Sequence, residues 1–149
     1  MVTNARADTE TVLTVEELRT YFTTRWGTVK AVDGISFDLR KGETLGIVGE
    51  SGCGKSVTML SLMRLIPEPP GRIVSGSITL DGEDIVQISE QEMAMIRGSK
   101  IALIIQDPMT SLNPVFSIGN QVEEAIQIHQ DIPKRSIMEG ALEVLRKVN

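Results

Sequence analysis

The sequence predicts an α/β fold in which an antiparallel β region comes first, strands and helices then alternate, and two helices close the chain. Three observations support this prediction. Residues 12–39 are rich in β-branched and aromatic side chains and are interrupted by turn residues. A glycine-rich loop at residues 49–56 stands between an apolar strand pattern and an apolar helix pattern. After residue 114 the apolar residues recur with helical spacing.

The composition limits the class of protein. The 149 residues include 15 Lys and Arg against 20 Asp and Glu, which gives a net charge of −5, and 41% are hydrophobic. Such a chain can bury a core, and no apolar run reaches the roughly 18 residues of a membrane-spanning helix. An acidic chain without basic blocks binds duplex DNA poorly, so we expect no nucleic-acid partner. The single cysteine excludes an internal disulfide and fits a reducing cytoplasm.

The N-terminal third is predicted to form an antiparallel meander. Residues 1–11 are polar, and we expect them to be disordered. From Val12 the chain has the residue types of strands, with turn signals at Gly27 and at Asp33-Gly34. The pattern breaks at residues 40–43, where the meander is expected to end.

Alternating elements follow the meander. Residues 44–48 form a short apolar run of strand type, and a helix pattern covers residues 57–66. Proline and glycine at residues 67–71 stop this helix. Two short strands are expected at residues 73–74 and 77–80, before an Asp-Gly turn.

The remaining elements are helices and one buried strand. Ser89 and Glu92 have the capping-box spacing that opens a short helix. The continuous apolar run Ile101–Ile105 is of the kind that is buried on both faces of a parallel sheet. Beyond Pro114 the pattern predicts two helices, split at residues 131–133.

The glycine-rich loop carries the chemistry. It matches the pattern G-x-x-x-x-G-K-[ST], and its glycines allow torsions that turn backbone N–H groups inward at a helix N-terminus, where an anion is favoured. Lys55 would supply positive charge to the β- and γ-phosphates, and the Ser56 hydroxyl suits Mg²⁺. The sequence therefore predicts a nucleoside triphosphate with Mg²⁺ here, the alternative being a glycine turn without a ligand. The predicted binding residues are Gly49, Glu50, Ser51, Gly52, Cys53, Gly54, Lys55, Ser56 and Val57.

Four stretches of sequence resemble the ATP-binding subunits of ABC transporters: residues 31–37, 42–57, 76–82 and 105–114. The string Q-D-P-M-T-S-L-N-P within the last stretch is especially similar to dipeptide and oligopeptide importers, a family that includes nickel and glutathione importers. The resemblance implies a P-loop NTPase core with an N-terminal antiparallel β subdomain and the start of a helical subdomain. It also implies ATP and Mg²⁺ as cofactors.

The resemblance assigns roles to single residues. Gln106 matches the Q-loop glutamine, which contacts Mg²⁺ and the attacking water. Gln106 is therefore the catalytic candidate and, with Ser56, a candidate metal ligand. An aromatic residue before the loop stacks on adenine in this family, and the candidates are Tyr21, Phe22 and Trp26. Phe22 is preferred and Trp26 is second, with packing in the core as the alternative for each.

Two further residues receive structural interpretations. Cys53 stands where the family uses Cys or Ser, so a small side chain, and not a redox switch, explains it. His129 is the only histidine, and the family's γ-phosphate-sensing histidine lies further along the chain than this sequence reaches. We therefore expect His129 to lie on a helix surface or in a core.

The resemblance further implies an incomplete domain. We expect a disordered segment at residues 1–11, a partial nucleotide-binding core with the β subdomain at residues 12–112, and the start of the helical subdomain at residues 113–149. The Leu-Ser-Gly-Gly signature and an apolar strand ending in Asp-Glu are absent from the sequence. We therefore expect weak Mg-ATP binding without turnover by this chain alone. An unpaired sheet edge is also expected to promote aggregation or dimerisation.

The implied function is that of an ATP-binding subunit of an importer for di- and oligopeptides, which couples ATP binding and hydrolysis to transport. The implied partners are transmembrane permease subunits and a second ATP-binding subunit, head to tail. The implied location is peripheral, at the cytoplasmic face of the inner membrane. Two alternatives stay open: another small P-loop kinase or NTPase, and a non-catalytic partner of transporter subunits.

Overall fold

The computed structural model describes residues 10–105, 112–130 and 132–148. The chain forms two compact units, a first unit of residues 1–93 and a second unit of residues 94–149. No helix within the described ranges combines the length and the apolar character that crossing a membrane requires.

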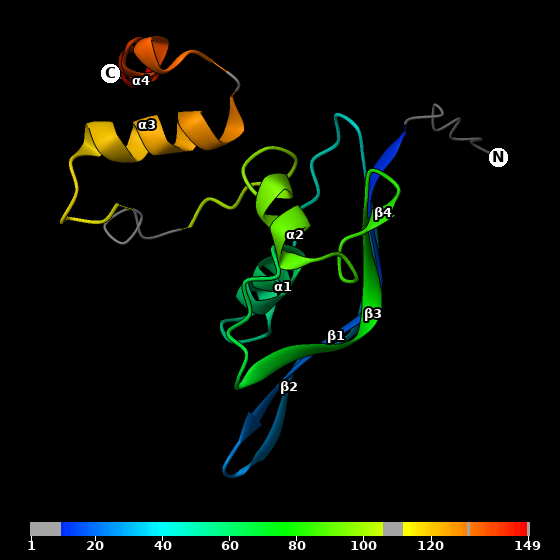
Figure 1. The fold of residues 1–149 in the computed structure, drawn as a ribbon. Coiled ribbons are helices and arrows are strands. Elements are labelled where there is room, and N and C mark those ends of the chain that lie inside the picture. Colours follow the sequence, from blue (N-terminus) through cyan, green and yellow to red (C-terminus); the bar gives the residue numbers. More distant parts are fainter. Residues whose placement is uncertain (1–9, 106–111, 131, 149) are drawn as a thin grey trace. The chain divides into compact units, whose positions relative to one another are not determined.

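The first unit is built on a four-stranded antiparallel sheet (Figure 1). Its strands are β1 (Thr11–Thr24), β2 (Gly27–Arg40), β3 (Gly71–Leu80) and β4 (Glu83–Asp84), in the order β2-β1-β3-β4. β1 is central and pairs along its length with both β2 and β3. The predicted antiparallel region is therefore confirmed, and β3 joins the same sheet.

The β1–β2 hairpin differs from the predicted meander at one point. The turn before Gly27 is confirmed, because Thr24 pairs with Gly27. The predicted turn at Asp33-Gly34 is wrong, since β2 runs through it. Gly34 has φ 83°, and the β1–β2 register shifts on both sides of Leu18, so the turn-forming residues make a bulge within a long strand.

β3 likewise replaces the two short strands that were expected. At Gly76 the φ angle is 96°, and a Cβ there would lie 2.6 Å from the carbonyl oxygen of Glu16 in β1. The glycine therefore lets β3 pass close to β1 at a bulge, where the β1–β3 register shifts between Glu16 and Arg19.

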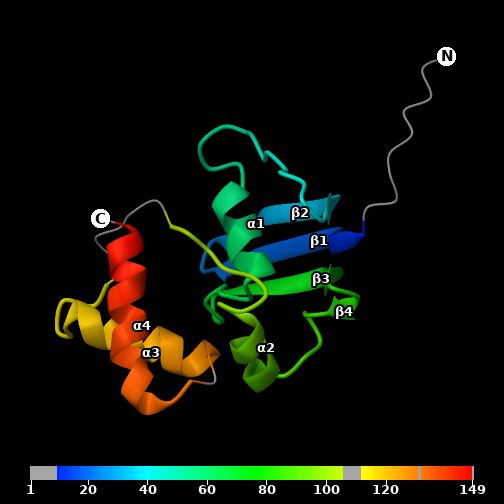
Figure 2. The same ribbon diagram turned by 90° about the horizontal axis from the view of Figure 1, so that it is seen from above.

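One face of the sheet packs against α1 (Lys55–Leu62), which lies across β1 and β2 in Figure 2. Alternate residues of the strands point toward this side and are buried, as the period of two requires. The largest fully buried side chains of the first unit are Val15, Leu18, Thr20, Ser61, Ile78, Ile85 and Met93.

Two buried hydroxyls join β1 to α1. Thr20 Oγ1 and Ser61 Oγ are 2.8 Å apart, and neither residue has any exposed surface. Ser61 Oγ donates to the carbonyl oxygen of Val57 at 2.7 Å. Because a serine hydroxyl has one proton, Thr20 is the donor in the bond between the two side chains. This bond fixes the helix that follows the glycine-rich loop.

The Ser61→Ala variant is expected to lower the free energy of unfolding by about 1–3 kcal/mol, because the buried Thr20 hydroxyl loses its partner. Adding Thr20→Val is expected to recover part of that loss, since no buried donor then remains. Urea unfolding of the two single variants and the double variant measures the coupling. Strictly additive losses would contradict this bond.

α1 ends earlier than its apolar pattern predicts. The helix stops at Leu62, and Arg64 has the left-handed φ of 50°. The N–H of Leu65 then bonds the carbonyl oxygen of Leu60 at 2.8 Å, which satisfies an acceptor at the helix end. The prediction of a helix to residue 66 is therefore wrong. The left-handed conformation that follows the helix belongs to Arg64, and the sequence has no glycine there to indicate the end.

α2 (Glu90–Ile96) confirms the capping box. The backbone N–H of Glu92 donates to Ser89 Oγ at 3.2 Å, and the backbone N–H of Ser89 donates to Glu92 Oε2 at 2.8 Å. The Ser89 hydroxyl also donates to Glu92 Oε2 at 2.7 Å. This bond, and then the bond from the Ser89 N–H, lower the pKa of the Glu92 carboxyl because they favour its ionised form.

The two runs with a strand pattern, the second of which was predicted to lie in a parallel sheet, are not strands. Residues 44–48 and 102–105 have no regular secondary structure, and Ile101 forms only an isolated bridge with Arg97. A parallel strand needs hydrogen bonds from neighbouring strands, and no strand among the described residues pairs with either run. Both runs are left largely exposed: Val48 is 92% and Ile104 is 96% exposed.

The second unit confirms the two C-terminal helices, α3 (Ile118–His129) and α4 (Lys134–Lys147). Ser117 caps α3 by accepting from the N–H of Asn120 at 3.2 Å. Ile126, Ile137 and Ala141 form the small core between the helices, with Val122 and Ile132 packed against it. Asp131, at the predicted split, lies outside the described residues.

Candidate phosphate-binding site

The glycine-rich loop leads directly into α1, as predicted. Gly52 and Gly54 have φ values of 81° and 95°, in the left-handed region, and Gly54 is the residue that caps the N-terminus of α1. The N–H groups of Lys55, Ser56 and Val57 open the helix, where no intrahelical acceptor exists for them. These donors and the helix dipole favour an anion at the loop.

β2 closes one side of this loop. A Cβ on Gly54 would lie 2.3 Å from the carbonyl oxygen of Ala31. The carbonyl oxygen of Gly54 in turn accepts from the N–H of Thr58 at 2.8 Å and from its hydroxyl at 3.1 Å. Gly54 is therefore fixed between the sheet and the first turn of α1, and only glycine fits there.

The Lys55 ammonium lies within the loop. Its Nζ donates to the carbonyl oxygens of Gly49 at 2.6 Å and Glu50 at 2.7 Å, and lies 3.6 Å from Cys53 Sγ. No carboxylate in the described part of the chain forms an ion pair with it. Neutral acceptors thus hold the ammonium while its charge remains uncompensated, which suits an incoming phosphate.

Cys53 and Gly49 pack against each other inside the loop. A Cβ on Gly49 would lie 2.5 Å from Cys53 Sγ, so the thiol takes the space that a side chain at residue 49 would need. The N–H of Cys53 donates to the carbonyl oxygen of Glu50 at 3.3 Å. These contacts agree with the interpretation of Cys53 as a small residue that the loop accommodates.

The two residues that follow Lys55 differ in their exposure. Ser56 is exposed on the first turn of α1, with its hydroxyl at the same end of the helix as the loop. Val57 is half-buried, and its carbonyl oxygen accepts the Ser61 bond. Within the described ranges no cluster of three His, Cys, Asp or Glu side chains could hold a metal ion. A cation here would therefore rely on Ser56 and on oxygens of a bound phosphate.

Phe22 and Trp26, the two preferred candidates for stacking on adenine, differ in their exposure. Phe22 is half-buried in β1, and its ring lies 2.6 Å from the position of a Cβ on Gly71. Trp26 is 81% exposed at the tip of the hairpin, where the Arg25 guanidinium lies 3.9 Å from its ring centre. The choice of Phe22 over Trp26 stays a prediction.

Tyr21 belongs to a polar cluster on the exposed face of the hairpin. Its hydroxyl donates to Asp33 Oδ1 at 2.5 Å, and Lys30 lies 5.3 Å from its ring centre. Asp33 also pairs with Arg19 at 3.3 Å and with Lys30 at 3.4 Å. The bond to Asp33 and partial desolvation raise the pKa of Tyr21 above 10.0. The same bond, together with Lys30, lowers the pKa of Asp33.

We expect the Asp33→Asn variant to bring the pKa of Tyr21 back toward its ordinary value, because the charged acceptor is removed. Absorbance at about 295 nm against pH measures this without interference, since Tyr21 is the only tyrosine. A pKa raised by folding stabilises the chain below the unfolded value, so this contribution is lost as pH rises through the alkaline range. Asp38→Asn, on the same strand, is the matched control. An unchanged titration in Asp33→Asn would contradict the assignment.

Gln106 lies outside the described residues, so its predicted roles stay predictions. His129 is exposed at the C-terminal end of α3, and its ring packs over Gly98, where a Cβ would lie 2.5 Å from His129 Nε2. Gly98 therefore leaves room for the imidazole. This packing agrees with the expected structural role of His129.

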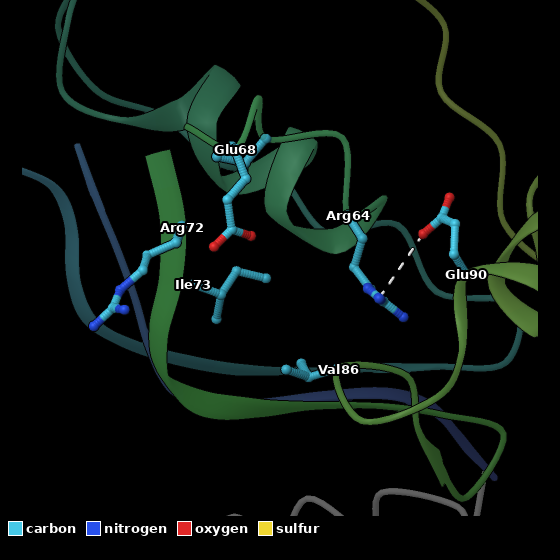
Figure 3. Close-up of a pocket in the computed structure, with 7 residues that line it drawn as sticks. Arg64, Glu68, Arg72, Ile73, Val86 and Glu90 are labelled. Carbon is cyan, nitrogen blue, oxygen red and sulfur yellow. Dashed lines mark ion pairs between the residues drawn. The ribbon is translucent and has the colours of Figure 1, made fainter. Parts of the chain in front are cut away.

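A pocket of about 250 Å³ in the first unit was not foreseen (Figure 3). Arg64 crosses it and donates to the carbonyl oxygens of Ile85 at 3.1 Å and Ile88 at 2.8 Å, with Glu90 3.8 Å away. No sequence motif marks this pocket, because it depends on the left-handed turn at the end of α1. It shares no residue with the glycine-rich loop, and its lining is Arg64, Ile66, Glu68, Arg72, Ile73, Val86 and Glu90.

Curated proteins with similar sequences cover nearly the whole of this chain. A peptide ABC transporter ATP-binding protein of Sinorhizobium fredii, named as probable, is 45% identical over 148 residues, 99% of this chain and 44% of the relative. The oligopeptide transport ATP-binding protein OppD of Bacillus subtilis is 48% identical over 137 residues, 92% of this chain and 38% of the relative. The chain therefore spans less than half the length of these relatives.

Solved structures share the fold. The ATP-binding cassette MJ0796, in a dimeric post-hydrolysis state bound to ADP and Pi, superposes with a TM-score of 0.76 at 20% identity. The match covers 90% of this chain and 56% of that chain. The sequence profile described as ABC transporter matches residues 32–148, which include the loop, α1 and both C-terminal helices. This match covers most of the chain, including a glycine-rich loop that has the geometry its motif predicts. The chain therefore belongs to the ABC transporter family.

Proposed function

We propose that this chain is part of an ATP-binding subunit of an ABC importer for di- and oligopeptides, and that residues 49–57 bind the phosphates of Mg-ATP. The observation that carries the proposal is the Lys55 ammonium, held in the loop by two carbonyl oxygens with no carboxylate ion pair among the described residues. The names of the relatives supply the transport context and the class of cargo.

Each part of the loop has a distinct task in this proposal. The N–H groups at the start of α1 and around Gly52 bind phosphate oxygens, and Gly54 holds these donors in place. Lys55 neutralises charge on the β- and γ-phosphates, while Ser56 is a ligand of Mg²⁺. When bound, Mg²⁺ supplies charge compensation at the phosphates. Phe22, with Trp26 as the alternative, stacks on adenine.

Gln106 is proposed as the residue that contacts Mg²⁺ and the attacking water. The boundaries proposed from the sequence, a core at residues 12–112 and the start of a helical subdomain at residues 113–149, belong to the same proposal. For the whole subunit, the proposed partners are transmembrane permease subunits and a second ATP-binding subunit. The proposed location is peripheral, at the cytoplasmic face of the membrane.

The chain by itself is proposed to bind Mg-ATP weakly and not to turn it over. Positioning and charge stabilisation carry phosphoryl transfer, and the sequence has no apolar strand ending in Asp-Glu to orient water. Phosphate release at a rate typical of a transporter ATPase, abolished by Lys55→Ala, would contradict this part of the proposal.

The Ser56→Ala variant tests the metal assignment. We expect it to weaken Mg-ATP binding about tenfold while leaving binding of metal-free ATP unchanged, because only the hydroxyl ligand of Mg²⁺ is lost. Fluorescence of a methylanthraniloyl-ATP probe, titrated with Mg²⁺ and again with EDTA, separates the two affinities. Ser77→Ala, on β3, is the control. An equal loss with and without Mg²⁺ would show that Ser56 acts on the loop and not on the metal.

A further inference from the structure

The pocket beside the end of α1 has no part in the proposed function. Its lining residues lie between residues 64 and 90, all within the first unit. Its volume of about 250 Å³ is just below the roughly 300–1,000 Å³ of sites for drug-sized ligands. The pocket therefore suits a molecule that is smaller than a drug.

One side of the pocket carries a fixed positive charge. Nη1 of Arg64 donates to the carbonyl oxygens of Ile85 at 3.1 Å and Ile88 at 2.8 Å, and the side chain is 22% exposed. Nη2 of Arg64 lies 3.8 Å from Glu90 Oε2, beyond hydrogen-bond distance, and the Glu90 side chain is 67% exposed. Such a loose, solvated ion pair contributes little, so another carboxylate can take the place of Glu90.

The other side of the pocket carries a negative charge. Figure 3 shows the Glu68 carboxylate directed toward Ile73, while the Arg72 guanidinium points away from the middle of the pocket. Among the residues that the structure describes, no side chain forms an ion pair with the Glu68 carboxylate. This carboxylate is therefore available to a positively charged group in the pocket.

The surface between the two charges is apolar. Ile66, Ile73 and Val86 line it, and each is half-buried. The N–H of Gly71 donates to the carbonyl oxygen of Pro67 at 2.9 Å, which fixes the backbone of the segment that carries the negative charge. The positive charge is fixed by its own two backbone bonds, so both charges are in place before a ligand arrives.

We infer that this pocket binds a small zwitterion, a free amino acid or a short peptide with an apolar side chain. Its ammonium pairs with Glu68, and its carboxylate replaces Glu90 beside Arg64. Its apolar side chain lies against Ile73 and Val86. The inference does not rest on nucleotide binding, because the pocket and the glycine-rich loop share no residue.

Other classes of ligand match the pocket less well. A phosphate or another anion would meet the carboxylates of Glu68 and Glu90, and a simple cation would meet Arg64. For a metal ion, the described part of the chain offers no cluster of three His, Cys, Asp or Glu side chains. An uncharged apolar ligand would displace water from both charges without pairing either of them.

The test is an NMR titration of the ¹⁵N-labelled chain with glycyl-L-leucine and, separately, with L-leucine. We expect a zwitterion to bind with a dissociation constant of about 1 mM and to shift the amide signals of Ile73 and Val86. The N-acetylated form lacks the ammonium and the amide form lacks the carboxylate, and each is expected to bind at least about tenfold more weakly. The tighter of the two zwitterions identifies a free amino acid or a peptide as the source.

Two glutamates of the pocket are expected to have opposite effects. Glu68→Gln should weaken binding of the zwitterion about tenfold and leave the N-acetylated form unaffected, because the two changes remove the same ion pair. Glu90→Gln should strengthen binding about two- to fivefold, because the competitor for Arg64 is lost. Glu83→Gln, an exposed position on β4 outside the pocket, is the matched control. Lys55→Ala is expected to leave zwitterion binding unchanged, so failure of the nucleotide site and failure of this pocket are distinguishable.

Recognition of the carboxylate is tested on the ligand and not on the protein. Arg64 also bonds two backbone carbonyl oxygens, so its replacement would disturb the segment before α2. The amide form of the ligand removes the same interaction from the wild-type chain, whose fold is unaltered.

Three outcomes would overturn the inference. The first is that neither zwitterion binds at about 10 mM to the folded chain. The second is that the N-acetylated and amide forms bind as tightly as the zwitterion. The third is that Glu68→Gln and Glu83→Gln change the affinity equally.

Discussion

The Gly54→Ala variant is expected to lose nucleotide binding and to unfold at a lower urea concentration. Gly54 has φ 95°, which costs a residue with a Cβ about 1–2 kcal/mol. The added methyl group would also lie 2.3 Å from the carbonyl oxygen of Ala31, a backbone atom within the β1–β2 hairpin that cannot turn aside. Such overpacking adds about 1–3 kcal/mol, so the expected loss in the free energy of unfolding is about 2–5 kcal/mol.

Gly82→Ala is the control for this variant. Gly82 has a similar φ of 84°, but nothing lies within 4 Å of a Cβ placed there. This variant is therefore expected to lose only the 1–2 kcal/mol that the backbone conformation costs, and to bind nucleotide normally. Urea unfolding followed by circular dichroism compares the two. Equal losses in both variants would show that the approach of Ala31 has no energetic consequence.

The Lys55→Ala variant is expected to weaken Mg-ATP binding by about 10–100-fold with little change in stability. A charge-assisted hydrogen bond contributes about 1.5–3 kcal/mol, which corresponds to that range of affinity. The ammonium bonds neutral groups at the loop's surface, two carbonyl oxygens and the Cys53 thiol, and these can be hydrated when it is removed. Equilibrium titration with the methylanthraniloyl-ATP probe measures the change.

Lys41→Ala controls for the loss of a positive charge in general. Lys41 is exposed, 3.6 Å from Glu10, at the end of the hairpin. Its removal is expected to leave the affinity within about twofold, because exposed charges are screened by solvent and salt. An affinity for Mg-ATP that Lys55→Ala leaves unchanged would contradict the role given to the loop.

Local signals in the sequence predicted local structure well. The Ser89–Glu92 spacing predicted a capping box because both partners lie within one helical turn, and the two reciprocal bonds confirm it. The loop and the start of α1 were predicted for the same reason. The turn predicted at Asp33-Gly34 was wrong, because the same residue types occur in turns and in bulges. Pairing with β1, which the local sequence does not show, determines that a bulge forms here.

Contacts between residues that are far apart in the sequence could not be predicted. Nothing in the motif at residues 49–56 indicates that the carbonyl oxygen of Ala31 touches Gly54, or that Thr20 donates to Ser61. The runs at residues 44–48 and 101–105 have strand composition, but a strand exists only where a neighbour offers hydrogen bonds. Composition alone therefore predicts the capacity to pair, and the sheet topology determines whether pairing occurs.

The most direct test of the central claim is a calorimetric titration of Mg-ATP into the folded wild-type chain. We expect binding to one site with a dissociation constant of about 0.1–1 mM, as befits a phosphate loop acting alone, and no heat of hydrolysis. The same titration of Lys55→Ala is expected to show a much weaker interaction. Absence of binding at ATP concentrations of about 10 mM, by a chain whose circular dichroism shows that it is folded, would contradict the proposal that this loop is a nucleotide site.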